Sequence, residues 1–125
     1  MRTTINAAII SAKRLLLVQK SWTWILPGGK PEADEQDEDC LRRKVAEELS
    51  GTELENLSYY GEFDVMTPHT RDTLVAKVYF ADINGDLGIP SREIRYRRWF
   101  RADDGHDLSD ITSKVIESLR GEGYL

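Results

Sequence analysis

Two adjacent glutamates, Glu47 and Glu48, lie at the end of a segment that is predicted to be a helix over residues 37–49. The apolar face of this helix consists of Leu41, Val45 and Leu49, which recur every fourth residue. On a helical wheel with about 100° per residue, Glu48 lies at the edge of the apolar face and Glu47 lies further round. A carboxylate beside the core is costly unless it is paired or binds a metal, and the helix dipole disfavours both anions at this end. The pattern indicates a cation site, and the alternative is a solvated charged face.

The preceding loop strengthens the prediction of a metal site. Pro27-Gly28-Gly29 lets the backbone approach a ligand closely and makes its carbonyls available as metal ligands. Glu32 and Glu35 add two carboxylates before the helix begins. Ligands that are all oxygen suit Mg²⁺ or Mn²⁺ better than zinc. The loop and helix together predict a divalent-cation site of this type.

The same segment resembles the Nudix box, the signature of the Nudix (MutT-like) hydrolases, G-x5-E-x7-R-E-U-x-E-E-x-G-U with U aliphatic. Gly29, Glu35, Arg43, Glu47 and Glu48 fall in register with the fixed positions of this pattern. The resemblance implies an α+β fold, the Nudix α/β/α sandwich with a mixed β-sheet, as a single domain over residues 1–125. It also implies an enzyme that cleaves a nucleoside diphosphate linked to another group, with divalent cations.

The resemblance assigns a role to each matching residue. Glu47 and Glu48 would bind Mg²⁺, with Mn²⁺ as a substitute, helped by the carbonyl of Gly29. Arg43 would orient a carboxylate, and Glu35 would support the loop or the outer shell of the metal. The expected substrate is a small nucleotide, with a damaged or surplus triphosphate preferred and ADP-ribose or a nucleotide sugar as the nearest alternative.

Lys44 departs from the pattern, because the family has glutamate directly after the box arginine. As an i,i+3 and i,i+4 neighbour of Glu47 and Glu48, the ammonium can reach both carboxylates and weaken metal binding and turnover. Alternatively, Lys44 points outward and another acid completes the site. The competing functional class is a Nudix-fold module that binds a nucleotide without hydrolysing it. Ser50, where the box usually has glycine, is a smaller departure, since Gly51 can end the helix.

The general base is expected outside the box, at Glu93 or Glu62, although each is more commonly a surface acid. The other candidates for substrate contact are Trp22, Tyr60, His69, Trp99, Phe100, Lys77, Arg95, Arg97 and Arg98. Packing or solvent exposure is the more common role of each such residue type. Pro68 lies downstream of the box at a distance that weakly resembles the ADP-ribose branch of the family.

The elements that must position this site are short strands around the helix. The predicted strands are Thr3–Ile10, Arg14–Val18, Trp22–Leu26, Leu57–Val65, Thr73–Ile83 and Ile94–Arg101. Turns are predicted at 11–13, 67–69 and 84–86. The spacing of Leu108, Ile111, Val115 and Leu119 predicts an amphipathic closing helix. Strands followed by helices without regular alternation favour a mixed sheet covered by helices.

Composition excludes several classes of protein. A chain of 125 residues can build one core, and a net charge of -5 argues against a nucleic-acid binder. No apolar run reaches membrane-spanning length, and the first residues lack the pattern of a secretory signal. Cys40 is the only cysteine, expected as a small buried helix residue, so an internal disulfide is impossible. A cytoplasmic protein that is a monomer or homodimer is expected.

Overall fold

The computed structural model describes residues 1–67, 71–85 and 96–125. Its strands are β1 (Arg2–Ser11), β2 (Arg14–Lys20), β3 (Thr23–Ile25), β4 (Gly28–Gly29), β5 (Thr52–Met66), β6 (Thr73–Gly85) and β7 (Tyr96–Phe100). Its helices are α1 (Asp37–Glu48) and α2 (Asp110–Gly121). The strands run in the order β3-β2-β1-β6-β5, with β4 paired to β1 and β7 paired to β2. The sheet is mixed, because β1 and β6 are parallel whereas the other pairs are antiparallel.

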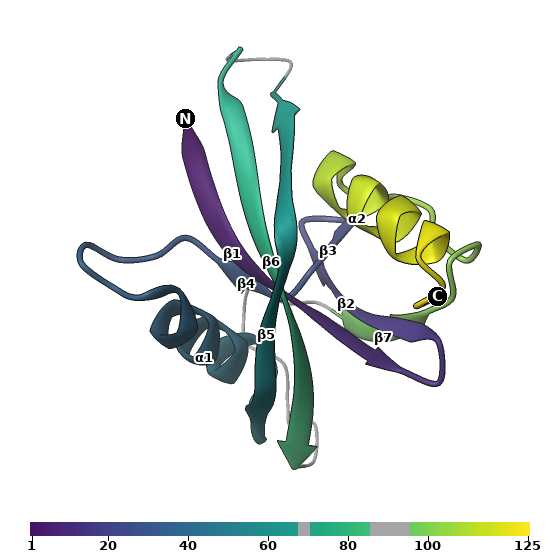
Figure 1. Ribbon diagram of the computed structural model, residues 1–125, viewed down its shortest axis with the longest axis horizontal. Coiled ribbons are helices and arrows are strands. Elements are labelled where there is room, and N and C mark those ends of the chain that lie inside the picture. The colour runs from purple at the N-terminus through teal and green to yellow at the C-terminus, as the bar shows by residue number, and fades with distance from the viewer. Residues whose placement is uncertain (68–70, 86–95) are drawn as a thin grey trace.

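The sheet is covered by a helix on each side, with α1 and α2 on opposite sides in Figure 1. Side chains alternate along a strand, so each face of β1 and β2 is packed against a different helix. The α1 side includes Ile5, Ala7, Ile9, Leu16 and Val18. The α2 side includes Ala8, Leu15, Leu17, Phe100 and Val115. This three-layer arrangement confirms the predicted α/β/α sandwich with a mixed sheet.

Among the element boundaries that differ from the prediction, those of β5 and α2 have a clear tertiary cause. β5 begins at Thr52 rather than Leu57, because Leu54 is buried in the core beside α1 and the strand pairs with β6 as far as Gly85. The predicted closing helix includes Leu108, whereas α2 begins at Asp110 after the cap residue Ser109. Leu108 instead forms an isolated parallel bridge with Trp24. In both cases a long-range contact decides the boundary.

The turn that joins β1 and β2 contains Ala12 and Lys13, which have φ values of 50° and 59°. A two-residue turn with positive φ matches the right-handed twist of a hairpin, and this confirms the predicted pairing of the first two strands. Among the described residues, neither helix is long and apolar enough to cross a membrane.

Candidate active site

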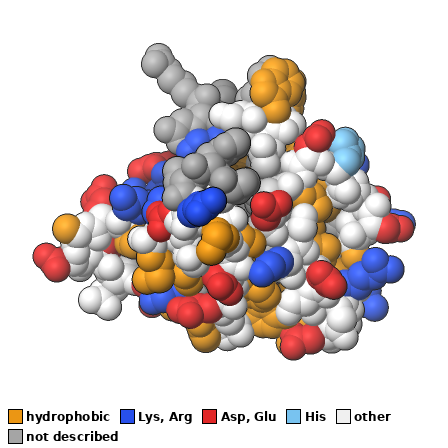
Figure 2. Space-filling view, turned by 90° about the horizontal axis from the view of Figure 1, so that it is seen from above, with side chains coloured by type: hydrophobic (Ala, Val, Ile, Leu, Met, Phe, Trp, Pro, Cys, Tyr) orange, Lys and Arg blue, Asp and Glu red, His pale blue; other side chains and the backbone are white. Residues whose placement is uncertain are grey.

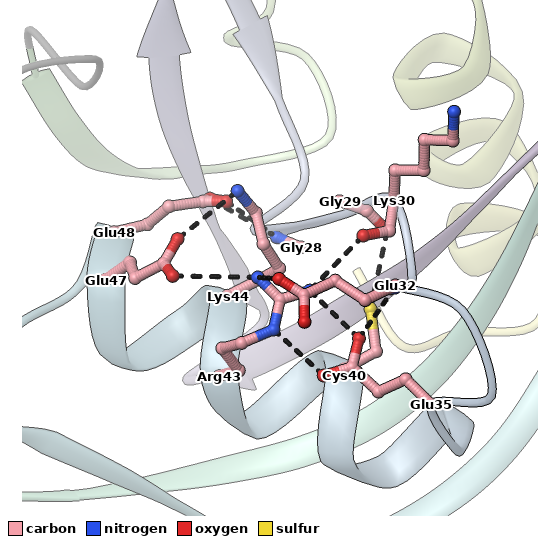
Figure 3. A network of polar contacts seen from close by, with 10 residues as sticks. All are labelled: Gly28, Gly29, Lys30, Glu32, Glu35, Cys40, Arg43, Lys44, Glu47 and Glu48. Carbon is pink, nitrogen blue, oxygen red and sulfur yellow. Dashed lines mark hydrogen bonds and ion pairs between the residues drawn. The ribbon is translucent and has the colours of Figure 1, made fainter.

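Three residues of α1 spaced four apart, Cys40, Lys44 and Glu48, form one row that faces β4 (Figure 3). β4 is held beside β1, where Gly28 is the partner of Asn6 in the sheet. A side chain at Gly28 would collide with the backbone oxygen of Ile5, and the residue has a φ of 136°. Glycine is required there, because both the space and the conformation exclude other residues. β4 is therefore held at a fixed position opposite the row formed by Cys40, Lys44 and Glu48.

Glu48 is buried, with 5% of its surface exposed, as the helical wheel predicted. The backbone N–H of Gly28 donates to its two carboxylate oxygens at 3.2 and 3.4 Å. Burial raises the pKa of Glu48 to about 7, although the Gly28 hydrogen bond and the nearby charges of Lys44 and Lys20 oppose the rise. Near neutral pH the ionised carboxylate of Glu48 is therefore costly unless a cation lies beside it.

Glu47 lies on the exposed side of the same helix end, with 52% of its side chain exposed. Its carboxylate is 3.6 Å from a guanidinium nitrogen of Arg43 and 3.4 Å from the ammonium of Lys44. Lys44 is only 19% exposed and reaches inward to this carboxylate. Of the two orientations considered for Lys44, the structure shows the inward one.

Arg43 and Glu35 form a two-pronged ion pair. Arg43 donates through Nε and Nη2 to the two oxygens of Glu35 at 2.8 and 2.9 Å. The backbone N–H of Glu32 also donates to Glu35, at 2.9 Å. The hydrogen bonds from Arg43 are the main reason that the pKa of Glu35 falls to about 2. Glu35 thus links the loop to α1.

Replacing Glu35 with glutamine is expected to destabilise the fold at pH 7. The lowered pKa of Glu35 means that the folded state favours its ionised carboxyl. The resulting contribution to the free energy of unfolding is present above pH 4.5 and is lost as the pH falls toward about 2. The difference between wild type and Glu35→Gln in urea unfolding should therefore shrink between pH 7 and pH 3. Glu38→Gln is the control, because Glu38 forms an exposed ion pair with Arg42 within α1. A pH-independent difference would contradict the assignment.

Cys40 has a role that sequence reasoning missed. Its thiol is buried and donates to the carbonyl of Gly29 across 3.7 Å. Burial raises the pKa of Cys40 to about 11, so the thiol stays protonated and remains a donor. The signal was present in the sequence, because Cys40 stands four residues before Lys44 and eight before Glu48.

The oxygen atoms at this helix end suit a hard divalent cation. Glu47 and Glu48 supply carboxylates, and Gly29 supplies a carbonyl that retains a second lone pair beside the thiol contact. Over the described ranges, no group of three or more His, Cys, Asp or Glu residues is placed to hold a metal. The chemistry of these donors, two carboxylates and a carbonyl, fits a hard divalent cation. The ammonium of Lys44 lies 3.4 Å from one of the two carboxylates, that of Glu47.

A cleft of about 380 Å³ opens beside this helix end, between β1, β4 and the start of α2. Its apolar lining consists of Ile25, Leu26, Leu74 and Ile111. Asn6 and Thr4 add polar groups, and the Asn6 amide donates to the Thr4 hydroxyl at 2.8 Å. A cleft of this size with an apolar floor and a few polar groups suits a small organic ligand such as a nucleoside.

Several other candidates lie elsewhere. Tyr60 packs on Phe80 and donates to Glu122 after α2, so its role is structural. Lys77 pairs with Asp37 at the start of α1, and Trp22 is 65% exposed. Phe100 and Trp99 pack in the core. The Arg98 guanidinium lies over the Phe100 ring. Arg97 is half-buried on the same strand, β7. Glu62 is exposed on β5 and does not line the cleft. Glu93, Pro68, His69 and Arg95 lie outside the described residues.

Comparison with known proteins identifies the family. The NUDIX domain model matches residues 1–119. A MutT NUDIX hydrolase from Burkholderia pseudomallei is 28% identical, with a TM-score of 0.83 over 93% of this chain and 95% of that one. The E. coli ORF135 protein is 21% identical, with a TM-score of 0.80 over 98% of this chain and 93% of that one. An ADP-ribose pyrophosphatase from Streptococcus suis is 22% identical, with a TM-score of 0.68 over 99% and 96%. No curated protein matches the chain.

The fold, the box residues and these matches define the class, a Nudix hydrolase. The chain belongs to the Nudix family and is similar in structure to its MutT-like members. Nudix hydrolases cleave diphosphate linkages in small nucleotide substrates and generally use divalent metal ions.

Proposed function

We propose that this chain hydrolyses the diphosphate linkage of a nucleoside di- or triphosphate derivative with Mg²⁺, or Mn²⁺ in its place. The observation that carries the proposal is the position of the cleft, which shares Gly28, Gly29 and Lys44 with the glutamate pair. A nucleoside in the apolar part of the cleft would direct its phosphates toward Glu47 and Glu48. The expected products are a nucleoside monophosphate and phosphate or a second phosphorylated product.

In this proposal, Glu47, Glu48 and the Gly29 carbonyl hold the cation. When bound there, a divalent cation would supply neutralisation of the diphosphate charge, activation of water and stabilisation of the leaving phosphate. Arg43 keeps Glu35 fixed and lies within 3.6 Å of Glu47, so it positions one ligand while it braces the loop. The Gly28 N–H fixes Glu48 in the same way. Glu93 remains the preferred general base, whereas Glu62 is exposed on β5 outside the lining of the cleft.

The preferred substrate is a damaged or surplus nucleoside triphosphate. The preference rests on the resemblance to small MutT-like members of the family, which often act on triphosphates, and a MutT NUDIX hydrolase is 28% identical to this chain. ADP-ribose or a nucleotide sugar is the nearest alternative, because an ADP-ribose pyrophosphatase and a UDP-X diphosphatase share this fold.

A different class of function has one observation in its favour. The inward ammonium of Lys44, 3.4 Å from Glu47, supplies a positive charge where the box pattern has a carboxylate. A chain that binds a nucleotide without hydrolysing it would be consistent with this charge.

A panel of nucleoside triphosphates, ADP-ribose and nucleotide sugars separates the two functions. The expected result is release of a nucleoside monophosphate from at least one compound with Mg²⁺, and none in EDTA. Thermal unfolding is followed in parallel with each compound. Stabilisation by a nucleotide without any hydrolysis would favour the binding module and would overturn the proposed activity.

A further inference from the structure

The cleft beside the glutamate pair is cationic in an acidic protein. Three lysines line it, Lys20, Lys30 and Lys44, and none of its described lining residues is acidic. The whole chain has a net charge of -5, so this set of positive charges is a local feature. Local positive charge in a concave surface attracts anions and raises their concentration there. The lining therefore suits a phosphorylated group before any metal is considered.

Lys44 is placed where the cleft meets the carboxylates. Its stem passes directly over Gly29, because a Cβ built on that glycine would lie 2.5 Å from Cε of the lysine. The small residue is thus what allows the lysine to lie flat against the turn. Figure 3 shows its ammonium near the carboxylate ends of Glu47 and Glu48, with the ion pair to Glu47 drawn as a dashed line. The charge lies at the edge of the cleft, on a side chain that is only 19% exposed.

The ion pair that holds Lys44 leaves it able to bind a second anion. An ammonium has three donors, and the hydrogen bond from Lys44 to Glu47 is long, at 3.4 Å. Glu47 is half exposed, and ion pairs that involve an exposed carboxylate contribute little to stability. A phosphate oxygen can therefore share or replace Glu47 as the partner of Lys44 at small cost.

We propose that Lys44, with Lys20 and Lys30, binds the diphosphate of the substrate directly, so that the chain holds a diphosphate without a divalent cation. Lys44 would then be a substrate-binding residue and not only a competitor of the metal. The inference rests on the proposed function, since it concerns the same cleft. It makes a separate prediction, however, because binding in the absence of metal requires no turnover.

The test is calorimetric titration of inorganic pyrophosphate into the full chain in excess EDTA. Wild type is expected to bind pyrophosphate, with an affinity that falls as NaCl is raised. Lys44→Met keeps the length of the side chain over Gly29 and removes the charge, and it should weaken binding about tenfold, the loss of a charge-assisted hydrogen bond. Thermal unfolding of each variant in EDTA checks that the fold is retained.

Lys13→Met is the matched control, because it removes the same charge from a different place. Lys13 lines another cavity, beside Arg14, Arg101 and Arg120. Pyrophosphate affinity should be unchanged by this substitution. The proposal is overturned if folded wild type fails to bind pyrophosphate in EDTA, or if Lys13→Met weakens binding as much as Lys44→Met. Hydrolysis in the nucleotide panel is a separate readout, so either proposal can fail without the other.

Discussion

Glu48→Gln is expected to lower metal-dependent hydrolysis by about 10²–10³-fold, the effect of removing one preorganised electrostatic group from an active site. Glutamine keeps the size of the side chain and an oxygen that can accept the hydrogen bond from the Gly28 N–H. It removes the negative charge that would hold the cation. The measurement is the rate of product release at saturating Mg²⁺ with the best compound of the nucleotide panel.

The same substitution is expected to stabilise the metal-free fold at alkaline pH. Burial raises the pKa of Glu48 from 4.5 to about 7, so ionising it in the folded state costs free energy. The cost is absent below pH 4.5, grows as the pH rises to about 7, and reaches on the order of 3 kcal/mol above it. Urea unfolding in EDTA should show similar stability for wild type and Glu48→Gln at pH 4.5, and a more stable variant at pH 8.

Glu47→Gln is the control for this prediction. Glu47 is half exposed, so its neutralisation should not produce the same gain in stability at pH 8. Equal stability of wild type and Glu48→Gln at pH 8 would contradict the idea that the buried carboxylate is costly. A Glu48→Gln variant that is stabilised but still hydrolyses at the wild-type rate would show that Glu48 is not a metal ligand.

Lys44→Glu is expected to tighten Mg²⁺ binding by about tenfold or more and to raise turnover. The substitution changes the local charge by two units beside the carboxylates. A unit charge about 4 Å away is worth on the order of 4 kcal/mol at an effective dielectric of 20, and solvent around the exposed Glu47 reduces this considerably. Isothermal titration of Mg²⁺ measures the affinity, and the nucleotide panel measures the rate.

Lys114→Glu is the matched charge reversal on α2, outside the lining of the cleft. It should leave Mg²⁺ affinity nearly unchanged. Equal Mg²⁺ affinity and rate in wild type and Lys44→Glu would sink the hypothesis that Lys44 weakens the metal site. Because Lys44→Glu should also lose metal-free pyrophosphate binding, its two effects on ligands have opposite signs. Partial unfolding would instead weaken both.

The sequence by itself determined the buried face of α1, the first hairpin and the family of this protein. The four-residue period of Leu41, Val45 and Leu49 placed one face of α1 in the core, and the wheel put Glu48 at its edge. Two short apolar runs separated at residues 11–13 predicted the first hairpin, which the structure confirms. Box spacing predicted the family and, with it, the sandwich. These features depend on local periodicity or on fixed spacing, which a sequence displays directly.

Only the tertiary structure decided how the glycine turn and the helix meet. The contact between Gly28 and Glu48 joins residues twenty positions apart, and it exists because β4 is paired to β1 while α1 packs on the same side. The direction of Lys44 followed from the same packing, since its side chain lies over Gly29 in the space that a Cβ on that glycine would occupy. The wheel allowed Lys44 to reach either carboxylate but could not choose inward over outward. That choice depends on which backbone lies against the helix, because a three-dimensional neighbour supplies the space and the partners that sequence spacing leaves open.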